Sequence, residues 1–394
     1  MRFSNGWTFA AVAVGLTALV SCFADSGSKD DPARGLTVHE WGTFSTFSGS
    51  NGKDVKFYPN DDDLPDFVHG YLSRQSKAGP AGGTVSLETP VLYFYADRPL
   101  TASVHVEFPK GTLTEWYPQA KRTDGRALAG DDPPSTLDWD GIKVLPGEAL
   151  KLPTETKEGR YYAARETDAA PLRVAAITNE GKVEEQEKFL FYRGVGDLDM
   201  PLKVRAWGDG KFTVDWTGGK PAGVMLLVQV RAGQVRFEPF IPDHATDGLL
   251  RADVRLPDAG ATLDQLGDAM TKILTEQGLY EKEARAMVKT WRSAWFGEQG
   301  TRVLYVLPRE ATDSFLPTKI DPKPTSYVRV MVGRHDVLTP DRERQIDGWV
   351  ATLDQPAADQ DAKLKTAAEE MARLGRYRDA AWEASRTRLQ GGGK

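Results

Sequence analysis

The chain has 394 residues, with 50 Lys and Arg against 56 Asp and Glu, and its formal net charge is −6. This acidic balance argues against a general nucleic-acid binder, which presents a basic face to the phosphate backbone. The only cysteine is Cys22, so no internal disulfide can form and stability must come from a conventional core. The length exceeds that of one ordinary core, and we expect two domains or one domain with an appendage.

Residues 1–22 have the pattern of a targeting segment. Arg2 is the only charged residue before Asp25, and an apolar run covers residues 7–20. This run is short for a membrane span, but it suits the apolar core of a signal peptide. We therefore expect the protein to be exported.

Cys22 ends this segment, after a leucine, a valine and a serine. The pattern resembles the bacterial lipoprotein signal, in which the cysteine is lipidated and becomes the new N-terminus. The resemblance implies that the membrane is a partner, through an N-terminal lipid, and that the protein lies in the cell envelope. A secreted or soluble periplasmic protein, cleaved near residues 22–24, is the alternative. Residues 23–35 are polar with Gly, Ser and Pro, which predicts a flexible tether.

Residues 36–260 predict a β domain, because short runs rich in Val, Tyr, Phe and Trp alternate with Gly, Pro and Asp. Residues 208–210 and 231–233 each separate two such runs and indicate β-hairpins. The runs at residues 91–96 and 102–108 are expected to form another hairpin. Many short strands without intervening helices favour an antiparallel β-sandwich or a jelly-roll-like domain.

At residues 262–265 the hydrophobic period changes to that of a helix. These residues, Thr-Leu-Asp-Gln, have the layout of a capping box, and a second helix is expected over residues 280–296. Strands are expected at residues 301–307 and 326–332, with a Pro-punctuated loop between them. Residues 261–338 therefore predict an α/β extension, which extends the β domain or forms a small layer.

A helical tail is expected over residues 339–394. Thr339 and Pro340 are the residue types of an N-cap and a first helical position. Gly375 is expected to break the later part of the tail into a helical hairpin. The predicted fold class is therefore mainly β, with a sandwich followed by an α/β extension and a C-terminal helical hairpin.

The stretch "LTVHEWGTF" contains the least ordinary pattern in the β domain. His39 and Glu40 begin like the zinc-protease motif His-Glu-x-x-His, but Thr43 occupies the place of the second histidine. In a strand, Glu40 falls on the apolar face and needs a hydrogen-bond or ionic partner there. Gly42 is expected to mark a β-bulge.

Two interpretations of Glu40 stay open. We favour a structural network that fixes the first strand. The alternative is a hydrolase cleft with the catalytic candidates Glu40, His39, Arg165, Glu166 and Arg193, because such charged groups near strands need partners and are suited to acid–base catalysis.

The sequence supports no metal site and no cofactor. None of the five histidines lies at metal-ligand spacing from another. The acidic stretches at residues 59–66 and 137–141 lack the spacing of a known calcium loop. The chain also has no phosphate-binding P-loop and no dinucleotide fingerprint.

Trp116, Tyr117 and Trp139 are the candidate ligand-binding residues. Exported β-sandwiches often bind carbohydrate by stacking aromatic rings against sugars. Aromatic residues are also the bulk of a large β core, and we expect most of the ten tryptophans to pack in the core.

Several stretches together resemble a family of uncharacterised, exported or lipid-anchored bacterial proteins. They cover most of residues 37–334 and are "TVHEWGTF", "LETPVLYFYA", "LTEWYPQA", "YYAARETDA", "EKFLFYRG", "EARAMVKTWRSAWF", "TRVLYVLP" and "VRVMVGR". The resemblance implies export, and it implies no assigned activity and no catalytic residues. Varied residues follow the last stretch in that family, so His335 and Asp336 are not expected to be shared site residues.

The sequence therefore predicts a lipid-anchored cell-envelope protein that acts as a non-catalytic binding module. Its expected partner, besides the membrane, is a glycan, a peptide or an envelope protein, and no nucleic acid. An envelope hydrolase is the alternative function.

Overall fold

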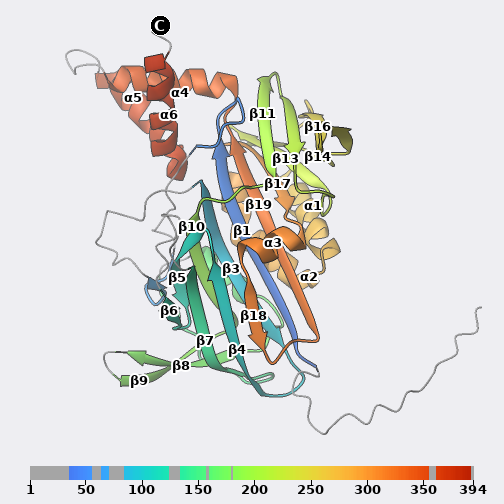
Figure 1. The fold of residues 1–394 in the computed structure, drawn as a ribbon. Helices are drawn as coiled ribbons and strands as arrows, with labels where there is room; N and C mark the ends of the chain where they lie inside the picture. The colour runs from blue at the N-terminus through green and yellow to red at the C-terminus, as the bar shows by residue number, and fades with distance from the viewer. Residues whose placement is uncertain are drawn as a thin grey trace, which may run out of the picture. The chain divides into compact units, whose positions relative to one another are not determined.

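The computed structural model describes residues 35–55, 64–70, 84–123, 134–156, 159–178, 181–354 and 361–391. The predicted signal segment with Cys22, and all but the last residue of the predicted tether, lie outside these residues. Within the described ranges, no helix combines the length and the apolar composition that crossing a membrane requires. The fold is mainly β with helices towards the C-terminus, which confirms the predicted fold class (Figure 1).

The central sheet has nine strands in the described part of the chain. From edge to edge they are β14 (Gln234–Phe240), β13 (Met225–Arg231), β17 (Gly300–Val306), β19 (Ser326–Val337), β1 (Thr37–Ser48), β3 (Val85–Tyr95), β10 (Leu190–Gly196), β5 (Gly111–Tyr117) and β2 (His69–Gly70). β1 and β19 lie in the middle and run parallel, whereas the other pairs of this sheet are antiparallel. Both are buried along almost their whole length, as is usual for parallel strands.

Gly42 lies opposite a β-bulge, so the predicted irregularity is present. One residue of β1, Gly42, faces two residues of β3, Thr89 and Pro90. Thr89 has a positive φ of 53°. A Cβ atom on residue 42 would lie 2.9 Å from the Cα atom of Pro90, so the strands approach too closely there for any side chain.

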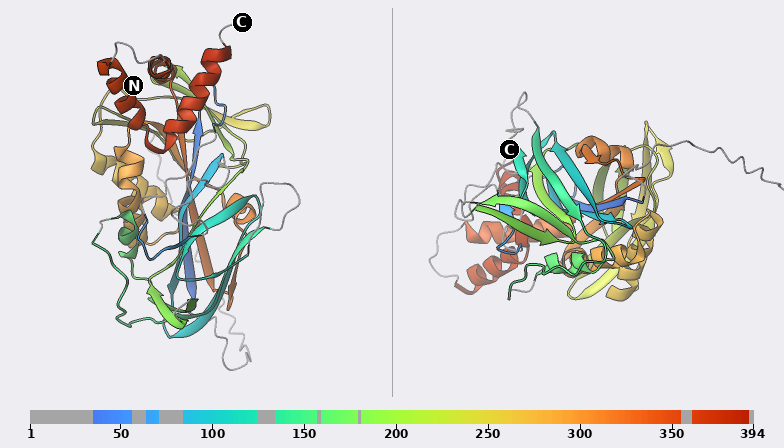
Figure 2. Two further views of the ribbon diagram at one scale, coloured as in Figure 1. Left: turned by 90° about the vertical axis from the view of Figure 1, so that its left-hand side faces the viewer. Right: turned by 90° about the horizontal axis from the view of Figure 1, so that it is seen from below.

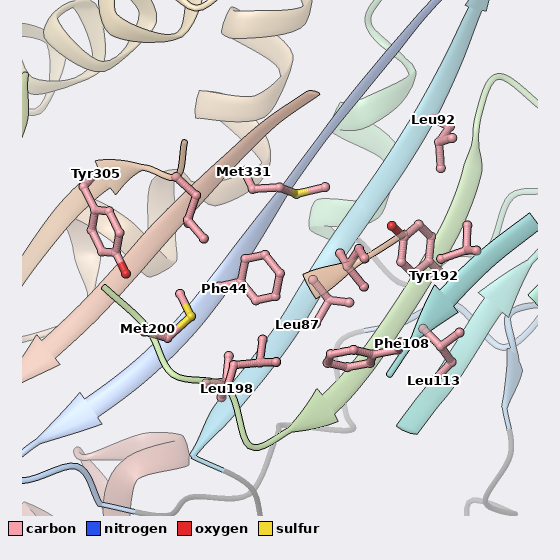
Figure 3. Packing of buried hydrophobic residues seen from close by; sticks show 14 of the residues in the cluster. Phe44, Leu87, Leu92, Phe108, Leu113, Tyr192, Leu198, Met200, Tyr305 and Met331 are labelled. Carbon is pink, nitrogen blue, oxygen red and sulfur yellow. The ribbon is translucent and has the colours of Figure 1, made fainter. Parts of the chain in front are cut away.

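One face of the central sheet packs against two smaller sheets and completes the sandwich. The first contains β18 (Thr318–Asp321), β4 (Leu100–Phe108), β7 (Ser135–Val144), β8 (Leu172–Thr178), β9 (Gly181–Glu187) and β6 (Lys121–Thr123), and the second contains β11 (Leu202–Gly208), β12 (Lys211–Trp216), β16 (Leu249–Arg255) and β15 (His244–Thr246). One hydrophobic core joins the three sheets. Figure 3 shows Phe44, Leu87 and Met331 of the central sheet in this core, with Phe108 and Met200 nearby.

The other face of the central sheet is covered by helices. They are η1 (Arg160–Arg165), α1 (Leu263–Glu276), α2 (Glu281–Arg292) and the π-helical turn η2 (Ser293–Gly297), and they share a second hydrophobic core with the sheet (Figure 2). α1 begins with the predicted capping box, because the side chains of Thr262 and Gln265 each accept a hydrogen bond from the other's backbone N–H.

The helical tail packs at the end of the sheet where β1 and β19 finish (Figure 1). It contains α4 (Pro340–Leu353), α5 (Asp361–Ala372), the 3-10 turn η3 (Gly375–Tyr377) and α6 (Arg378–Gly391). As predicted, Thr339 caps α4 and the later helix is broken at Gly375. Phe47 of β1 stacks on Tyr377 with ring centres 4.6 Å apart, which ties the tail to the sheet.

Two local predictions are wrong. Residues 91–96 and 102–108 do form strands, but β3 belongs to the central sheet and β4 to a smaller one, so they are not a hairpin. The Pro-punctuated loop after β17 contains a helix, α3 (Arg309–Phe315), and the strand β18, which pairs with β4. Pairing with distant strands overrides the local signals in both places.

The α/β extension expected over residues 261–338 does not stand apart from the β domain. Its strands β17 and β19 lie in the middle of the central sheet, next to β13 and β1. The described residues from 35 onwards accordingly pack as one unit.

Replacing Gly42 with alanine should lower the free energy of unfolding by about 1–3 kcal/mol, because the methyl group overlaps Pro90 and Met331. Urea denaturation of the full chain measures this loss. Gly348→Ala is the control, since Gly348 lies inside α4 with open space where a Cβ would stand. That variant should gain about 0.5–1 kcal/mol from helix propensity. Equal changes in the free energy of unfolding for the two variants would contradict the close approach of the strands at Gly42.

Candidate functional site

Glu40 projects from β1 into the interior of the sandwich and is 0% exposed. Its Oε2 atom accepts hydrogen bonds from Arg329 Nε at 2.5 Å and from Tyr327 OH at 2.6 Å, and its Oε1 atom accepts one from Tyr192 OH at 2.5 Å. Arg329 is also the residue that β19 places opposite Glu40. Glu40 therefore has the ionic and hydrogen-bond partners that its position on the apolar face of the strand requires.

The other two nitrogens of the Arg329 guanidinium, Nη1 and Nη2, also donate hydrogen bonds to neighbouring residues. Nη1 donates to Asp313 Oδ1 and to the carbonyl oxygen of Leu316, each at 2.8 Å. Nη2 donates to Thr318 Oγ1 at 3.2 Å. Each nitrogen of this buried cation thus has an acceptor, as a buried ion pair requires.

The surroundings keep Arg329 and the two tyrosines of this network protonated. Burial alone would lower the pKa of Arg329, but the negative charge of Glu40, its hydrogen bond and the neighbouring Tyr327 and Tyr192 together outweigh burial and raise that pKa well above its usual range. Burial, with the nearby Glu40, raises the pKa of Tyr192 and of Tyr327. Both phenols therefore stay protonated and act as donors. Glu40 lies in a closed network and not in an open cleft.

His39 points to the opposite face of β1, towards α2. Its Nδ1 atom lies 2.6 Å from Glu283 Oε2, and its ring packs against Tyr95 and Tyr280. Glu283 also accepts a hydrogen bond at 2.9 Å from the backbone N–H of Tyr280, at the start of α2. His39 is 2% exposed and links the sheet to α2.

Arg165 and Glu166 are neighbours at the end of η1 but reach different partners. Arg165 Nη2 lies 2.6 Å from Oε2 of the buried Glu187. Burial raises the pKa of Glu187, and the hydrogen bonds from Arg165 act against that rise. Glu166 is 55% exposed and pairs with Lys289 of α2 at 2.6 Å.

The five candidates of the hydrolase hypothesis therefore do not line one cleft. Glu40 lies inside the sandwich, whereas His39 lies under α2. Arg193 follows Tyr192 in β10, so its side chain points away from the sandwich interior, and it is buried. Glu166 lies at the surface. The sheet itself separates Glu40 from His39 and Arg193.

The aromatic candidates pack in the hydrophobic cores. Trp116 and Trp139 belong to the core between the sheets, and Tyr117 belongs to the core under the helices. All three are buried, and Trp139 Nε1 donates to the carbonyl oxygen of Pro118 at 2.8 Å. None of the three presents a ring face to solvent on which a sugar could stack.

A strip of polar side chains lies on the helix-covered face of the central sheet. This polar strip consists of Thr43, Ser45, Ser86, Glu88 and Arg193. The hydroxyl oxygens of Thr43, Ser45 and Ser86 are buried and have no hydrogen-bond partner among the described residues. Buried polar groups nearly always have such partners, so the strip departs from a core built for stability alone. Each of its members is nonetheless buried, and we place the candidate binding site elsewhere.

An open groove lies at the end of the central sheet next to the helical tail. This tail groove is lined chiefly by residues 208–212, 229–231, 299–301 and 336–339 and by side chains of α4 and η3. Its cavity volume is about 620 Å³, which lies within the range of small-ligand sites. We take the tail groove as the candidate functional site.

Two tight turns and one helix start position the walls of the tail groove. Asp209 and Gly210 have φ angles of 49° and 71°, and Ala232 and Gly233 have 50° and 78°. Paired positive φ angles are typical of type I′ turns, whose twist matches that of a hairpin. The two hairpins, β11–β12 and β13–β14, thus end in the tail groove, and Thr339 starts α4 beside them.

Five cationic side chains line the tail groove, and they are Lys211, Arg231, Arg236, Arg255 and Arg342. None of the five forms an ion pair with a carboxylate of the residues that the structure describes. Arg342 donates from Nη1 to Gln345 Oε1 at 3.0 Å and lies over the ring of Trp349 at 4.7 Å. Arg236 donates to Gln229 Oε1 and to the carbonyl oxygen of Pro257.

The base of the tail groove is held by a buried charge network around Asp336. Its Oδ1 atom lies 3.0 Å from Arg302 Nε, and its Oδ2 atom lies 2.6 Å from Arg334 Nε. Tyr377 OH donates to the same Oδ2 atom at 2.9 Å. Burial lowers the pKa of Arg302, and the charge of Asp336 acts against that change. The network joins β17, β19 and η3 under the groove.

Sequence patterns alone do not predict that the segments lining the tail groove lie close together. The two glycine-containing turns and the Thr339-Pro340 helix start are each visible locally. Their meeting at one end of the sheet depends on the order of strands from β1 to β19, which no local pattern specifies.

No protein-family model matches this chain, and no curated protein matches it either. The family resemblance of the short stretches therefore stays a prediction. Over the described ranges, no three His, Cys, Asp or Glu side chains are grouped as the ligands of a metal ion would be.

His335 should make the stability of the fold depend on pH. Its two ring nitrogens lie 2.8 Å from Thr46 Oγ1 and 2.9 Å from Ser48 Oγ. Burial lowers the pKa of His335 from 6.5 to about 4, although Asp54 and Asp336 act in the opposite direction. Between these two values the unfolded chain binds the proton and the folded chain does not. The part of the unfolding free energy that comes from neutral His335 is therefore complete above pH 6.5. It is lost as the pH falls towards 4.

We expect this single group to account for about 3 kcal/mol of the stability lost between neutral pH and pH 4. Guanidinium denaturation of the full chain at a series of pH values measures the effect. His335→Gln keeps a polar side chain without the titration, so its unfolding free energy should fall less steeply than that of the wild type. Parallel pH profiles of the two proteins would show that His335 has no part in the acid sensitivity.

Proposed function

We propose that this chain is an exported, lipid-anchored cell-envelope protein that binds a ligand in the tail groove without converting it chemically. The observation that carries the proposal is an open cavity of about 620 Å³ whose walls come from the helical tail, two hairpins and the end of the central sheet. A cavity of this size is usual for a small-ligand site, and both apolar and charged side chains line it.

The cationic and amide side chains at the tail groove are suited to binding an anion. Arginine stays protonated at all physiological pH values, so it holds oxyanions but does not exchange protons with them. Gln229, Gln299 and Gln345 also line the groove, and their neutral amides act as donors and acceptors. The acid–base candidates Glu40 and His39 are bonded elsewhere in the fold.

The anchor rests on the sequence around Cys22, which resembles a lipoprotein signal. A lipid at Cys22 followed by a polar tether over residues 23–35 would hold the folded part at the membrane surface. The ligand would then be a component of the cell envelope that carries oxygen-rich groups.

Two variants of the full chain test both parts of this proposal in one experiment. Gln345→Trp places a large side chain at an exposed position of α4 in the tail groove. Cys22→Ala removes the lipid acceptor. Cells are fed a fatty acid with a clickable tag, and each purified protein is weighed by native mass spectrometry to detect a ligand bound from the cell.

We expect Gln345→Trp to keep the lipid tag and lose the bound ligand, and Cys22→Ala to lose the tag and keep the ligand. Equal tagging of the Cys22→Ala chain would contradict the anchor. A ligand mass that is the same in Gln345→Trp as in the wild type would contradict binding in the tail groove.

A further inference from the structure

The tail groove has an excess of positive charge, although the whole chain has a net charge of −6. Its five cations are opposed by few free carboxylates. Asp336 is compensated by Arg302 and Arg334, and Asp341 pairs with Arg344. This leaves two carboxylates at the groove, those of Asp209 and Asp258, and they form no ion pair with a described residue.

Arg231 and Arg342 belong to different walls of the tail groove. Arg231 is the last residue of β13, and Arg342 lies in the first turn of α4. Burial lowers the pKa of Arg342, and the positive charge of Arg231 lowers it further, while Glu370 acts against both. Both side chains line the same cavity, so their like charges oppose each other there, and an anion bound between them would replace this repulsion by two attractions.

Arg342 is already held in position for such a contact. Its guanidinium lies over Trp349 and donates to Gln345, so fewer conformations are lost when a ligand binds. Guanidinium groups bind phosphate and carboxylate through two parallel hydrogen bonds, which gives them both affinity and direction.

Apolar side chains also line the tail groove, beside its polar and charged ones. They include Phe47, Val230, Leu338, Leu374 and Tyr377. A free inorganic anion would leave these side chains in contact with water, whereas an anion with an attached hydrocarbon body would cover their accessible surface. Covering apolar surface stabilises a complex by about 25 cal/mol for each Å² that is removed from water.

We propose that the tail groove binds an organic oxyanion, in which a phosphate or a carboxylate is attached to an apolar body, and that Arg231 and Arg342 clamp the anionic group. This inference rests on the proposed function and adds the chemical class of the ligand. It also names the two side chains that recognise it.

Calorimetric titration of the full chain with four probes that share one octyl chain tests the inference. Octyl phosphate and octanoate carry the two oxyanions, octyl glucoside is the uncharged probe, and octylammonium is the cation. One or both anions should bind, with a Kd that rises with ionic strength, and octylammonium should not bind. The tighter of the two anions identifies phosphate or carboxylate as the preferred group.

Arg231→Gln and Arg342→Gln should each raise the Kd of the preferred anion about tenfold or more, because each removes one charged hydrogen-bond donor. Arg285→Gln is the matched control, since it removes the same charge from an exposed position on α2, outside the groove. Its Kd should stay within about twofold of the wild-type value, since salt screens exposed charges.

Two results would overturn the inference. If octyl glucoside binds as tightly as the anions and the arginine variants leave its Kd unchanged, the groove binds ligands but does not select oxyanions, and the proposed function stands. If none of the four probes binds, the oxyanion inference is wrong. The proposed function is then decided separately, by comparing the ligand mass bound to Gln345→Trp with that bound to the wild type.

Discussion

The ion pair between Glu40 and Arg329 is the interaction on which the arrangement of the central sheet depends. The two side chains are 289 positions apart in the sequence and face each other across the parallel pair β1–β19. A buried charge without its partner costs several kcal/mol, so each group is tolerated only where the other is in register. A shift of one residue would turn Glu40 to the helix-covered face and leave Arg329 without it. The pair therefore specifies how the first strand meets the last one.

That register also determines where the tail groove forms. β19 ends at Val337, and Thr339 starts α4 immediately afterwards, so the helical tail is attached directly to the centre of the sheet. Phe47 at the end of β1 stacks on Tyr377 and closes the base of the groove from the other strand. A carboxylate on an apolar strand face, which invites a catalytic interpretation, thus has a structural role. The surface suited to binding lies at the opposite end of the same strands.

Local features of this fold were predictable because their causes are local. The capping box at Thr262, the Thr339 helix start and the two glycine-containing hairpins each depend on a few consecutive residues. The alternation of side chains along a strand was also enough to show that Glu40 needs a polar or charged partner in the core. That Arg329 is this partner, that β4 leaves the sheet of β3, and that the groove exists at all depend on pairings between distant strands. A single sequence carries no direct record of such pairings.

A double-mutant cycle on Glu40→Gln and Arg329→Met, measured by denaturant unfolding of the full chain, tests the central claim most directly. Arg329→Met leaves the buried Glu40 without its ionic partner, and Glu40→Gln leaves the buried Arg329 with only the half-exposed Asp313. Each single variant should lose about 3–5 kcal/mol of unfolding free energy. The double variant should lose less than the sum of the two, by about 2 kcal/mol or more, because it removes both charges together. Additive losses, with a coupling energy near zero, would show that Glu40 and Arg329 do not depend on each other and would contradict this account of the fold.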